Sequence, residues 1–226
     1  MHTLPLALTL DLDDTLWPIW PTIDRAEGVL HAWLTEHAPA TAARFDRAAL
    51  RTLRNEVAVE SPDRLHDLSA LRQESLRRAL QHAGDDEALA APAFEVFFAA
   101  RQDVVLYDEV LAVLERLSQR FPLMALTNGN ADLDRIGLSR FFRGSVTARN
   151  LGVAKPDQRI FHHACERLGC APGQVLHIGD DYELDVVGAV NAGLQAVWLR
   201  REGELLAGDG YRVFSTLTAL ADELLA

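Results

Sequence analysis

The fold is decided by Leu4–Thr15, LPLALTLDLDDT, in which a short apolar run ends in a cluster of carboxylates. Pro5 is compatible only with the beginning of a strand, and the apolar residues after it are typical of a strand that is buried on both faces. Asp11, Asp13 and Asp14 follow at once. The stretch therefore predicts a buried parallel strand with an acidic carboxyl end.

A different composition begins at residue 22 and continues to about residue 102. This stretch is rich in Ala, Arg, Leu and Glu, and its apolar residues recur at intervals of three and four. We expect about four helices, interrupted near Pro39, near Ser61–Pro62 and near Gly84–Asp85. No strand is expected there, so residues 19–102 are predicted to be an all-helical insertion after the first strand.

Helices and strands alternate after Tyr107. Helices are expected at residues 108–120, 157–168, 183–192 and 216–225, with a short one ending at 138, and strands at 122–126, 145–148, 174–178 and 196–199. Such alternation predicts an α/β fold, a Rossmann-like parallel sheet with helices on both faces. Residues 1–18 and 103–226 would form this α/β core domain, and residues 19–102 the inserted helical domain.

The composition excludes several classes of protein. The net charge is −11, from 22 basic and 33 acidic side chains, which argues against nucleic acid as a partner. No run of 18 apolar residues is present, and the first ten residues lack the basic start of a signal peptide, so we expect a cytoplasmic protein without a membrane partner. Two cysteines cannot form a disulfide framework. The oligomeric state is left open.

Lys155 is the only lysine in the chain, since the other basic residues are all arginine. An ammonium is a compact, strongly hydrated point charge, whereas a guanidinium is a bulky planar fork. A single lysine among so many arginines therefore suggests a position where arginine would not serve.

Polar clusters follow three of the predicted strands, at Asp11–Thr15, Thr127–Gly129 and Gly179–Asp181. Ligands of open parallel sheets bind outside the carboxyl ends of the strands, so these clusters and Lys155 should meet in one crevice. Neighbouring carboxylates repel one another unless a cation lies among them, and oxygen ligands without histidine or cysteine favour Mg²⁺. Lys155 and the Thr127 hydroxyl can donate to phosphate oxygens, and a spare carboxylate can act as a nucleophile.

These clusters resemble the four motifs of the haloacid dehalogenase superfamily of hydrolases. Asp11–Thr15 is similar to the first motif, Leu126–Gly129 to the second, Lys155–Asp157 to the third and Gly179–Asp185 to the fourth. All four occur in the family's order, and the resemblance extends over essentially the whole chain. It implies that residues 19–102 are the helical cap domain that this family inserts after its first motif.

The resemblance also implies a phosphatase mechanism. Asp11 would attack phosphorus and form an aspartyl-phosphate, and Asp13 would protonate the leaving alkoxide and then activate water. Mg²⁺ would be held by the Asp11 carboxylate, the Asp13 backbone carbonyl and the Asp180 carboxylate. Dehalogenases of the superfamily lack an acid at the second position because a halide leaves without a proton. Asp13 therefore favours a phosphatase over a dehalogenase.

The other motif residues would bind the phosphoryl group or support those that do. The resemblance assigns Thr127, the Asn128 backbone and Lys155 to phosphate binding. Asp181 and Asp185 would lie behind these groups and orient water or Lys155. His177 lies inside a predicted buried strand. It is expected to be a core histidine whose ring nitrogens have hydrogen-bond partners.

The substrate is expected to be a small phosphorylated metabolite. The sequence as a whole resembles the flavin-pathway phosphatases of the superfamily. This resemblance implies 5-amino-6-(5-phospho-D-ribitylamino)uracil as the substrate. A promiscuous phosphatase of nucleotides or sugar phosphates is the alternative, as are a phosphomutase and a non-catalytic phosphometabolite-binding or regulatory relative. His66 and Arg72 in the helical insertion are candidates to contact a polar leaving group, and a surface ion pair is the other interpretation of both.

Overall fold

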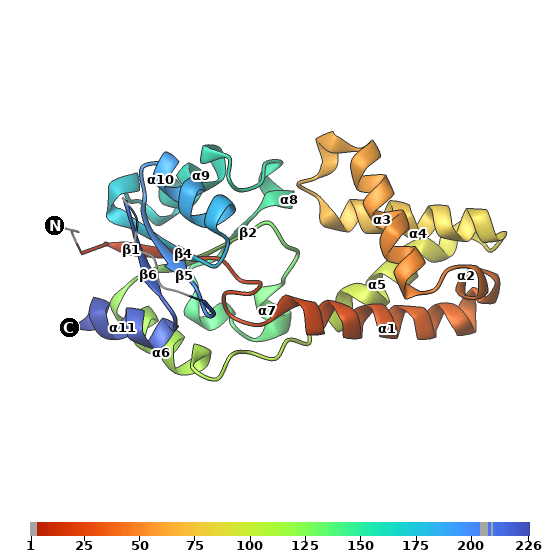
Figure 1. Ribbon diagram of the computed structural model, residues 1–226, viewed down its shortest axis with the longest axis horizontal. Coiled ribbons are helices and arrows are strands. Elements are labelled where there is room, and N and C mark those ends of the chain that lie inside the picture. Colours follow the sequence, from red (N-terminus) through yellow and green to blue (C-terminus); the bar gives the residue numbers. More distant parts are fainter. Residues whose placement is uncertain (1–3, 204–207, 209) are drawn as a thin grey trace. The chain divides into compact units, whose positions relative to one another are not determined.

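The computed structural model describes residues 4–203, 208 and 210–226 (Figure 1). The chain divides into two compact units, an α/β unit made of Met1–Pro18 and Val105–Ala226, and a helical unit, Ile19–Val104. The expected fold class is confirmed, because a parallel sheet with helices on both faces is accompanied by an inserted segment in which only helices are described.

The sheet contains six parallel strands in the described residues, in the order β3-β2-β1-β4-β5-β6. Their bounds are β1, Ala7–Leu10; β2, Leu123–Thr127; β3, Ser145–Thr147; β4, Val175–Gly179; β5, Gln195–Leu199; and β6, Tyr211–Phe214. β1, β2 and β4 are buried along their whole length, which explains why they are apolar on both faces. Because all strands are parallel, their carboxyl ends lie along one edge of the sheet.

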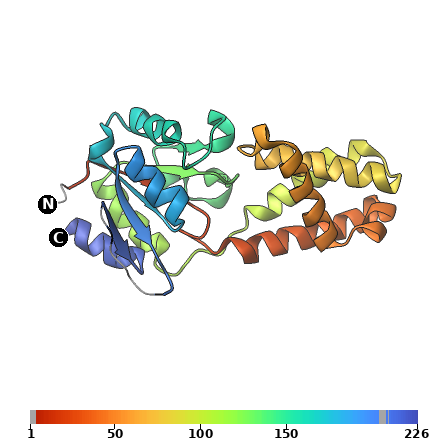
Figure 2. The same cartoon turned by 45° about the horizontal axis from the view of Figure 1, so that its top comes forward.

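Helices cover both faces of the sheet (Figures 1 and 2). α9 (Gln158–Leu168) and α10 (Gly188–Asn191) pack together on one face, and α6 (Val110–Arg120) and α11 (Leu217–Leu225) on the other. Shorter elements in the connections are α7 (Leu133–Ile136), α8 (Ala148–Leu151), η3 (Ser139–Phe141), η4 (Pro172–Gln174) and η5 (Tyr182–Val187). This arrangement leaves the carboxyl edge of the sheet to the loops that follow the strands.

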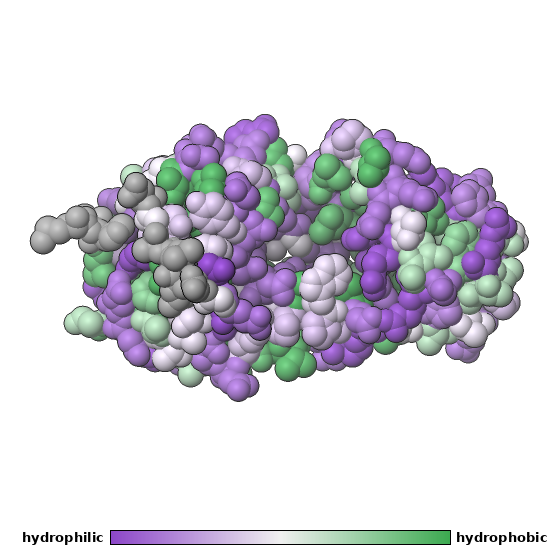
Figure 3. All heavy atoms as spheres, in the orientation of Figure 1, coloured by the Kyte–Doolittle hydropathy of each residue, from purple (hydrophilic) through white to green (hydrophobic). Residues whose placement is uncertain are grey.

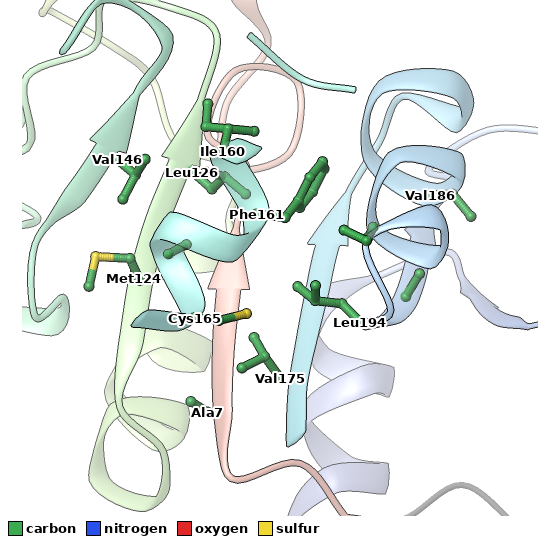
Figure 4. Close-up of a cluster of buried hydrophobic side chains, with 14 of the residues drawn as sticks. Ala7, Met124, Leu126, Val146, Ile160, Phe161, Cys165, Val175, Val186 and Leu194 are labelled. Carbon is green, nitrogen blue, oxygen red and sulfur yellow. The ribbon is translucent and has the colours of Figure 1, made fainter. Parts of the chain in front are cut away.

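One hydrophobic cluster fills the space between the sheet and α9 (Figure 4). Its labelled members are Ala7, Met124, Leu126, Val146, Ile160, Phe161, Cys165, Val175, Val186 and Leu194. Cys165 is buried among them as a small apolar side chain, and it is a free cysteine. Burial of these side chains fixes β1, β2 and β4 relative to one another, and with them the loops at their carboxyl ends.

The structure differs from the expected elements of this unit in two places. β6 was not expected, since its half-buried edge position does not require an apolar run. The helix expected at residues 183–192 begins instead as the π-helical turn η5 and continues as α10. Turns of this kind occur often at functional sites because they reorient one or two side chains.

The helical unit contains five α-helices rather than about four. They are α1 (Ile19–His37), α2 (Pro39–Arg44), α3 (Arg47–Glu60), α4 (Leu68–Ala83) and α5 (Ala90–Arg101), with short turns η1 (Pro62–Arg64) and η2 (Glu87–Leu89). The extra break lies between α2 and α3, where the Asp46 side chain accepts a hydrogen bond from Ala49 N and begins a new helix. The expected breaks near Pro39, Ser61–Pro62 and Gly84–Asp85 are present.

Hydrophilic residues cover most of the surface in view in Figure 3, and the apolar residues there form small separate patches. This agrees with the net charge of −11. Among the described residues, no helix is both long enough and apolar enough to cross a membrane.

Candidate active site

Strand β1 ends directly before Asp11 and thereby places this carboxylate at the carboxyl edge of the sheet. The Asp11 amide donates to the carbonyl of Ile178 on β4 (2.9 Å), so the backbone is still held by the neighbouring strand. The side chain is buried. Asp11 is therefore a fixed carboxylate in the middle of the sheet edge.

Lys155 is brought to Asp11 from a loop by the side chain of Asn128. The Lys155 amide donates to Asn128 Oδ1 (2.7 Å), and Asn128 Nδ2 donates to the Lys155 carbonyl (3.0 Å). These two hydrogen bonds hold the backbone of Lys155 beside the end of β2. The sequence suggested only the Asn128 backbone as a phosphate ligand, so this use of its side chain was not predicted.

The Lys155 ammonium lies between two carboxylates. Its Nζ donates to Asp11 Oδ1 and to Asp185 Oδ1, both at 2.6 Å. Burial by itself would lower the pKa of Lys155, but the two carboxylates outweigh burial and raise it above its usual value. The lysine is therefore charged at neutral pH.

Asp185 is buried with both of its carboxylate oxygens occupied. Oδ1 accepts from Lys155 and from His177 Nε2 (3.0 Å), and Oδ2 accepts from the Asp181 amide (3.0 Å). Gly179 makes room for this arrangement, because a Cβ there would lie 2.2 Å from Asp185 Cγ. Although burial raises the pKa of Asp185, Lys155 and His177 hold it below its usual value.

Asp180 follows β4 and is held by a loop residue from the other side of the site. Its Oδ1 accepts a hydrogen bond from Thr15 Oγ1 (2.9 Å), and its carbonyl accepts from Trp198 Nε1 (2.8 Å). Burial and the nearby Asp185 charge raise the pKa of Asp180 to about 6. Burial also raises the pKa of Asp11 well above its usual value, against the opposing effect of Lys155.

The carboxylates of this cluster fit a hard divalent cation. One oxygen from each of Asp11, Asp180 and Asp185 lies within 4.8 Å of the others. Burial, and then the neighbouring Asp185 charge, raise the pKa values of Asp11 and Asp180, and a cation bound between these carboxylates would oppose both effects. Asp185 is already fully hydrogen-bonded, so Asp11 and Asp180 are the two carboxylates available to a metal.

Asp180 is accessible from solvent through an open cavity of about 350 Å³ on the α/β unit. The cavity is also lined by Asp14, Tyr107, Trp198 and Arg200. An access path of this kind is required for an exchangeable metal.

The loop after β1 forms a tight turn around Asp13. Trp17 Nε1 donates to Asp13 Oδ1 (2.9 Å), and the amide of Asp14 donates to the Trp17 carbonyl (2.8 Å). Asp14 has a φ of 58°, a left-handed conformation that aspartate tolerates better than most residues. Asp13 is half-buried, and Trp17 is completely buried.

Two other predicted residues have local roles in the backbone. Thr127 Oγ1 accepts a hydrogen bond from the Gly129 amide (2.9 Å) at the end of β2. The exposed Asp181 side chain accepts from the Leu184 amide (2.9 Å) and begins η5. Asp181 therefore supports Asp185 through its backbone amide and not through its carboxylate.

The two candidates from the insertion lie in the helical unit. Arg72, on α4, is buried, which contradicts the surface ion pair considered from the sequence. Its Nη2 lies 3.4 Å from Glu27 Oε1, and its guanidinium stacks 3.7 Å from the centre of the Phe97 ring. The leucine-rich pattern of α4 gave no sign that this arginine faces inward. His66 is half-buried just after η1.

Three residues of the site were not predicted as such. His177 was expected only as a core residue, and Thr15 only as the last residue of the first acidic cluster, without a chemical role of its own. Arg201 was not considered, yet its Nη2 donates to the Thr15 carbonyl (2.8 Å) and its Nη1 to Glu109 (2.7 Å). The position of Thr15 inside the first acidic cluster was a signal for the contact with Asp180, whereas nothing in the sequence pairs Arg201 with that loop.

A family model for haloacid dehalogenase-like hydrolases matches residues 6–193. The chain belongs to this family. The resemblance stated from the four motifs is thus confirmed, and the matched residues include the whole helical insertion and the larger part of the α/β unit of this hydrolase.

Known proteins of the family agree with this assignment. The hydrolase is 35% identical to the 5-amino-6-(5-phospho-D-ribitylamino)uracil phosphatase YigB of Escherichia coli K12, over 88% of the chain and 86% of that protein. It is 37% identical to a phosphoserine phosphatase of Thermus thermophilus, over 58% of the chain and 55% of that protein. A solved structure titled 2-haloacid dehalogenase, from Pseudomonas syringae pv. tomato, shows 37% identity and a TM-score of 0.89 over 97% of both chains. The expectation of an enzyme of the phosphatase type in this family is confirmed.

Proposed function

We propose that this hydrolase is a Mg²⁺-dependent phosphomonoesterase that acts through an aspartyl-phosphate and takes 5-amino-6-(5-phospho-D-ribitylamino)uracil as its substrate. The observation that carries the mechanism is the buried triad in which Lys155 Nζ bonds to Asp11 and Asp185 at 2.6 Å. A lysine beside a carboxylate attracts a phosphoryl dianion to that carboxylate, which would otherwise repel it.

Asp11 is the proposed nucleophile. One of its carboxylate oxygens forms a bond to phosphorus as the bond between phosphorus and the leaving alkoxide oxygen breaks. The Lys155 ammonium neutralises part of the charge on the phosphoryl oxygens, and the Thr127 hydroxyl and the Asn128 amide can donate to them. Asn128 contributes further by holding the Lys155 backbone.

Asp13 is the proposed acid and base. It gives its proton to the leaving alkoxide and is then ionised, so that it can remove a proton from the water that attacks the aspartyl-phosphate. That attack releases inorganic phosphate and restores the Asp11 carboxylate. The bond from Trp17 Nε1 fixes the Asp13 carboxyl group in one orientation for both steps.

The proposed metal ligands are the Asp11 carboxylate, the Asp13 backbone carbonyl and the Asp180 carboxylate. Bound Mg²⁺ supplies positive charge that stabilises the developing charge on the phosphoryl oxygens. Thr15 holds Asp180 in place, and Asp185 orients Lys155.

The extent of the match to YigB supports the choice of substrate. An alignment over 88% of the chain is longer than the α/β unit and must include most of the helical unit, whereas a match over 58% need not. We propose that residues 1–18 and 103–226 are the catalytic domain and that residues 19–102 are a cap domain that selects the substrate. His66 remains a candidate contact, and Arg72 would act from within the core of the helical unit. We place the enzyme in the cytoplasm, where such phosphometabolites are made.

Dehalogenation is the second candidate function, because a structure with that title is 37% identical over 97% of the chain. Asp13 favours phosphate ester hydrolysis, since an alkoxide needs a proton to leave and a halide does not. A broad nucleotide or sugar phosphate phosphatase has the same site and differs only in selectivity.

The test is an assay of phosphate and halide release with Mg²⁺ or with EDTA. The panel contains the ribityl compound, flavin mononucleotide, nucleoside monophosphates, sugar phosphates, phosphoserine and 2-chloropropionate. Asp11→Asn should reduce phosphate release at least about 1,000-fold, because an amide does not attack phosphorus. Asp14→Asn is the matched control, since it removes a neighbouring carboxylate from a position that asparagine also tolerates.

Preference for the ribityl compound, with loss of activity in Asp11→Asn but not in Asp14→Asn, supports both mechanism and substrate. Similar release from many compounds retains the mechanism and favours the broad phosphatase. Halide release without phosphate release would make the protein a dehalogenase. Saturable binding of a phosphometabolite without any turnover would make it a non-catalytic relative.

A further inference from the structure

A continuous chain of hydrogen bonds runs beneath the site and returns to the strand from which it starts. It joins the Thr9 hydroxyl to His177 Nδ1 (2.8 Å) and His177 Nε2 to Asp185 Oδ1 (3.0 Å). From there it continues through Lys155 Nζ to Asp11, with both bonds at 2.6 Å. Thr9 lies on β1, and Asp11 directly follows the end of this strand. The series of hydrogen bonds therefore begins and ends within two residues of the same segment.

The sheet register and the core fix this arrangement. Thr9 and His177 face each other across the β1–β4 pair, and both are completely buried. Phe161 of the hydrophobic cluster packs edge-on against the His177 ring, with ring centres 5.2 Å apart. Water cannot replace a lost partner at such depth without new space, so a donor or acceptor that loses its partner remains unsatisfied.

The charges determine which ring nitrogen of His177 carries the proton. Burial lowers the pKa of His177, so the ring is neutral and has a single N–H. Asp185 is ionised and can only accept hydrogen bonds, because Lys155 and His177 hold its pKa low against the effect of burial. The proton must therefore be on Nε2, and Nδ1 accepts from the Thr9 hydroxyl.

We propose that His177 is a positioning residue for catalysis, whose Nε2–H fixes the Asp185 carboxylate so that Lys155 is held against Asp11. The inference rests on the proposed function, because it takes Asp11 as the nucleophile. His177 itself does not touch Asp11.

The role follows from how Asp185 is bound. Its Oδ1 is shared by His177 and Lys155, while the one partner of Oδ2 in the described structure is the Asp181 amide. Without the donor on His177, the sole fixed partner of the carboxylate is that amide, and the carboxylate can rotate with the flexible lysine. Lys155 then loses its fixed position on the nucleophile. Loss of a supporting residue of this kind costs about 10- to 100-fold in activity.

Two amide variants separate positioning from mere packing. In His177→Gln the side-chain NH₂ reaches the position of Nε2 and can donate to Asp185. In His177→Asn the shorter side chain places its amide at the position of Nδ1, beside Thr9. Both replace the imidazole by a neutral amide, so loss of the ring affects both.

We expect His177→Gln to keep a kcat close to that of the wild type, and His177→Asn to lose about 10- to 100-fold in kcat with little change in KM. Thr9→Val is a control for stability, since it removes the hydrogen bond to Nδ1 but leaves the donor to Asp185. Its melting temperature should fall while its kcat stays close to that of the wild type. Equal loss of kcat in the two amide variants, or in Thr9→Val, would overturn the proposal.

The second readout is independent of activity. Lys155 is the only lysine in the chain, so protein labelled with ¹³C-lysine gives a single side-chain NMR signal set. That signal should be single and sharp in the wild type and in His177→Gln, and broadened or split in His177→Asn. An unchanged Lys155 signal in His177→Asn would contradict the proposal even if the enzyme hydrolysed none of the substrates tested. Absence of phosphate release together with the expected NMR changes would instead count against the proposed function alone.

Discussion

Each of the two units contains a small cluster of charges that is buried at its centre, and the clusters have opposite compositions. In the α/β unit one ammonium, that of Lys155, is shared by the carboxylates of Asp11 and Asp185. In the helical unit one carboxylate, that of Glu27, is shared by the guanidiniums of Arg51 and Arg72. The first cluster therefore has an excess of negative charge and the second an excess of positive charge.

The surroundings of the two clusters respond differently to the excess charge. In the helical unit, burial and then the nearby Arg54 lower the pKa of Arg72 to about 10, and the aromatic ring of Phe97 covers the guanidinium. In the α/β unit, burial and then the nearby Asp185 charge raise the pKa of Asp180 to about 6. The excess positive charge of the arginine cluster is thus covered by the protein itself, and we propose that a cation from solution balances the excess negative charge of the carboxylate cluster.

The largest expected effect on stability comes from removing the shared ammonium. Lys155→Met leaves two buried carboxylates without their partner and should lower the free energy of unfolding by about 3–5 kcal/mol. Arg159→Met is the control, because the exposed Arg159–Asp157 ion pair should contribute little. Urea denaturation of both variants measures the difference, and equally small changes would contradict the buried triad.

The next effect concerns the cation that we propose for the carboxylate cluster. Mg²⁺ at 100 times its dissociation constant should raise the free energy of unfolding by about 2.7 kcal/mol. Asp180→Asn should abolish this increase, whereas Asp181→Asn, which changes the adjacent exposed carboxylate, should retain it. Thermal denaturation with Mg²⁺ or with EDTA, at constant ionic strength, is the measurement. An equal Mg²⁺ effect in the two variants would place the ion elsewhere.

A smaller effect is expected in the helical unit. Glu27→Gln removes the charge that Arg51 and Arg72 share and should cost about 2 kcal/mol, because Arg72 is buried and Arg51 can be hydrated again. Arg72→Met should cost less in the Glu27→Gln background than in the wild type, which a double-mutant cycle measures. Strict additivity of the two changes would show that the cluster is not a unit. Mg²⁺ should not alter any of these differences.

The last expected effect is on the pH dependence of stability in the metal-free protein. Since the pKa of Asp180 is raised to about 6 from a usual value near 3.8, the folded protein binds a proton more tightly than the unfolded chain does. Stability in EDTA should therefore fall as the pH rises from about 4 to 6, by at most about 1.4 kcal/mol per pH unit. Asp180→Asn should lack this contribution, and denaturation from pH 4.5 to 7 compares the two proteins. A steeper loss in the variant would contradict the assignment.

Much of the fold could be predicted because buried parallel strands are apolar along their whole length. The strands at Ala7–Leu10, Leu123–Thr127 and Val175–Gly179 have this property and end in polar clusters. Strand β6 is half-buried at the edge and has no such run. The break between α2 and α3 depends on the single capping contact of Asp46, which a pattern of apolar residues does not reveal.

The site was predictable where function depends on strand ends and not where it depends on partners across the sheet. Lys155 and the carboxylates of Asp11 and Asp185 were singled out because they follow or adjoin motifs. The interaction of His177 with Asp185 requires the sheet register and the turn η5, neither of which local sequence specifies. The inward-facing Arg72 was missed for a similar reason, since Glu27 and Phe97 come from other helices.

Because the single lysine is buried, its chemical reactivity can be used to measure unfolding of the α/β unit. Lys155 is only 4% exposed, so an amine-acylating reagent can modify this side chain only when the α/β unit opens. The rate of acylation at Lys155 is then a measure of how often that opening occurs. Occupation of the site by a ligand that stabilises the closed unit should slow the reaction in proportion. A mass increase of one acyl group on one peptide would follow the process without any label or engineered residue.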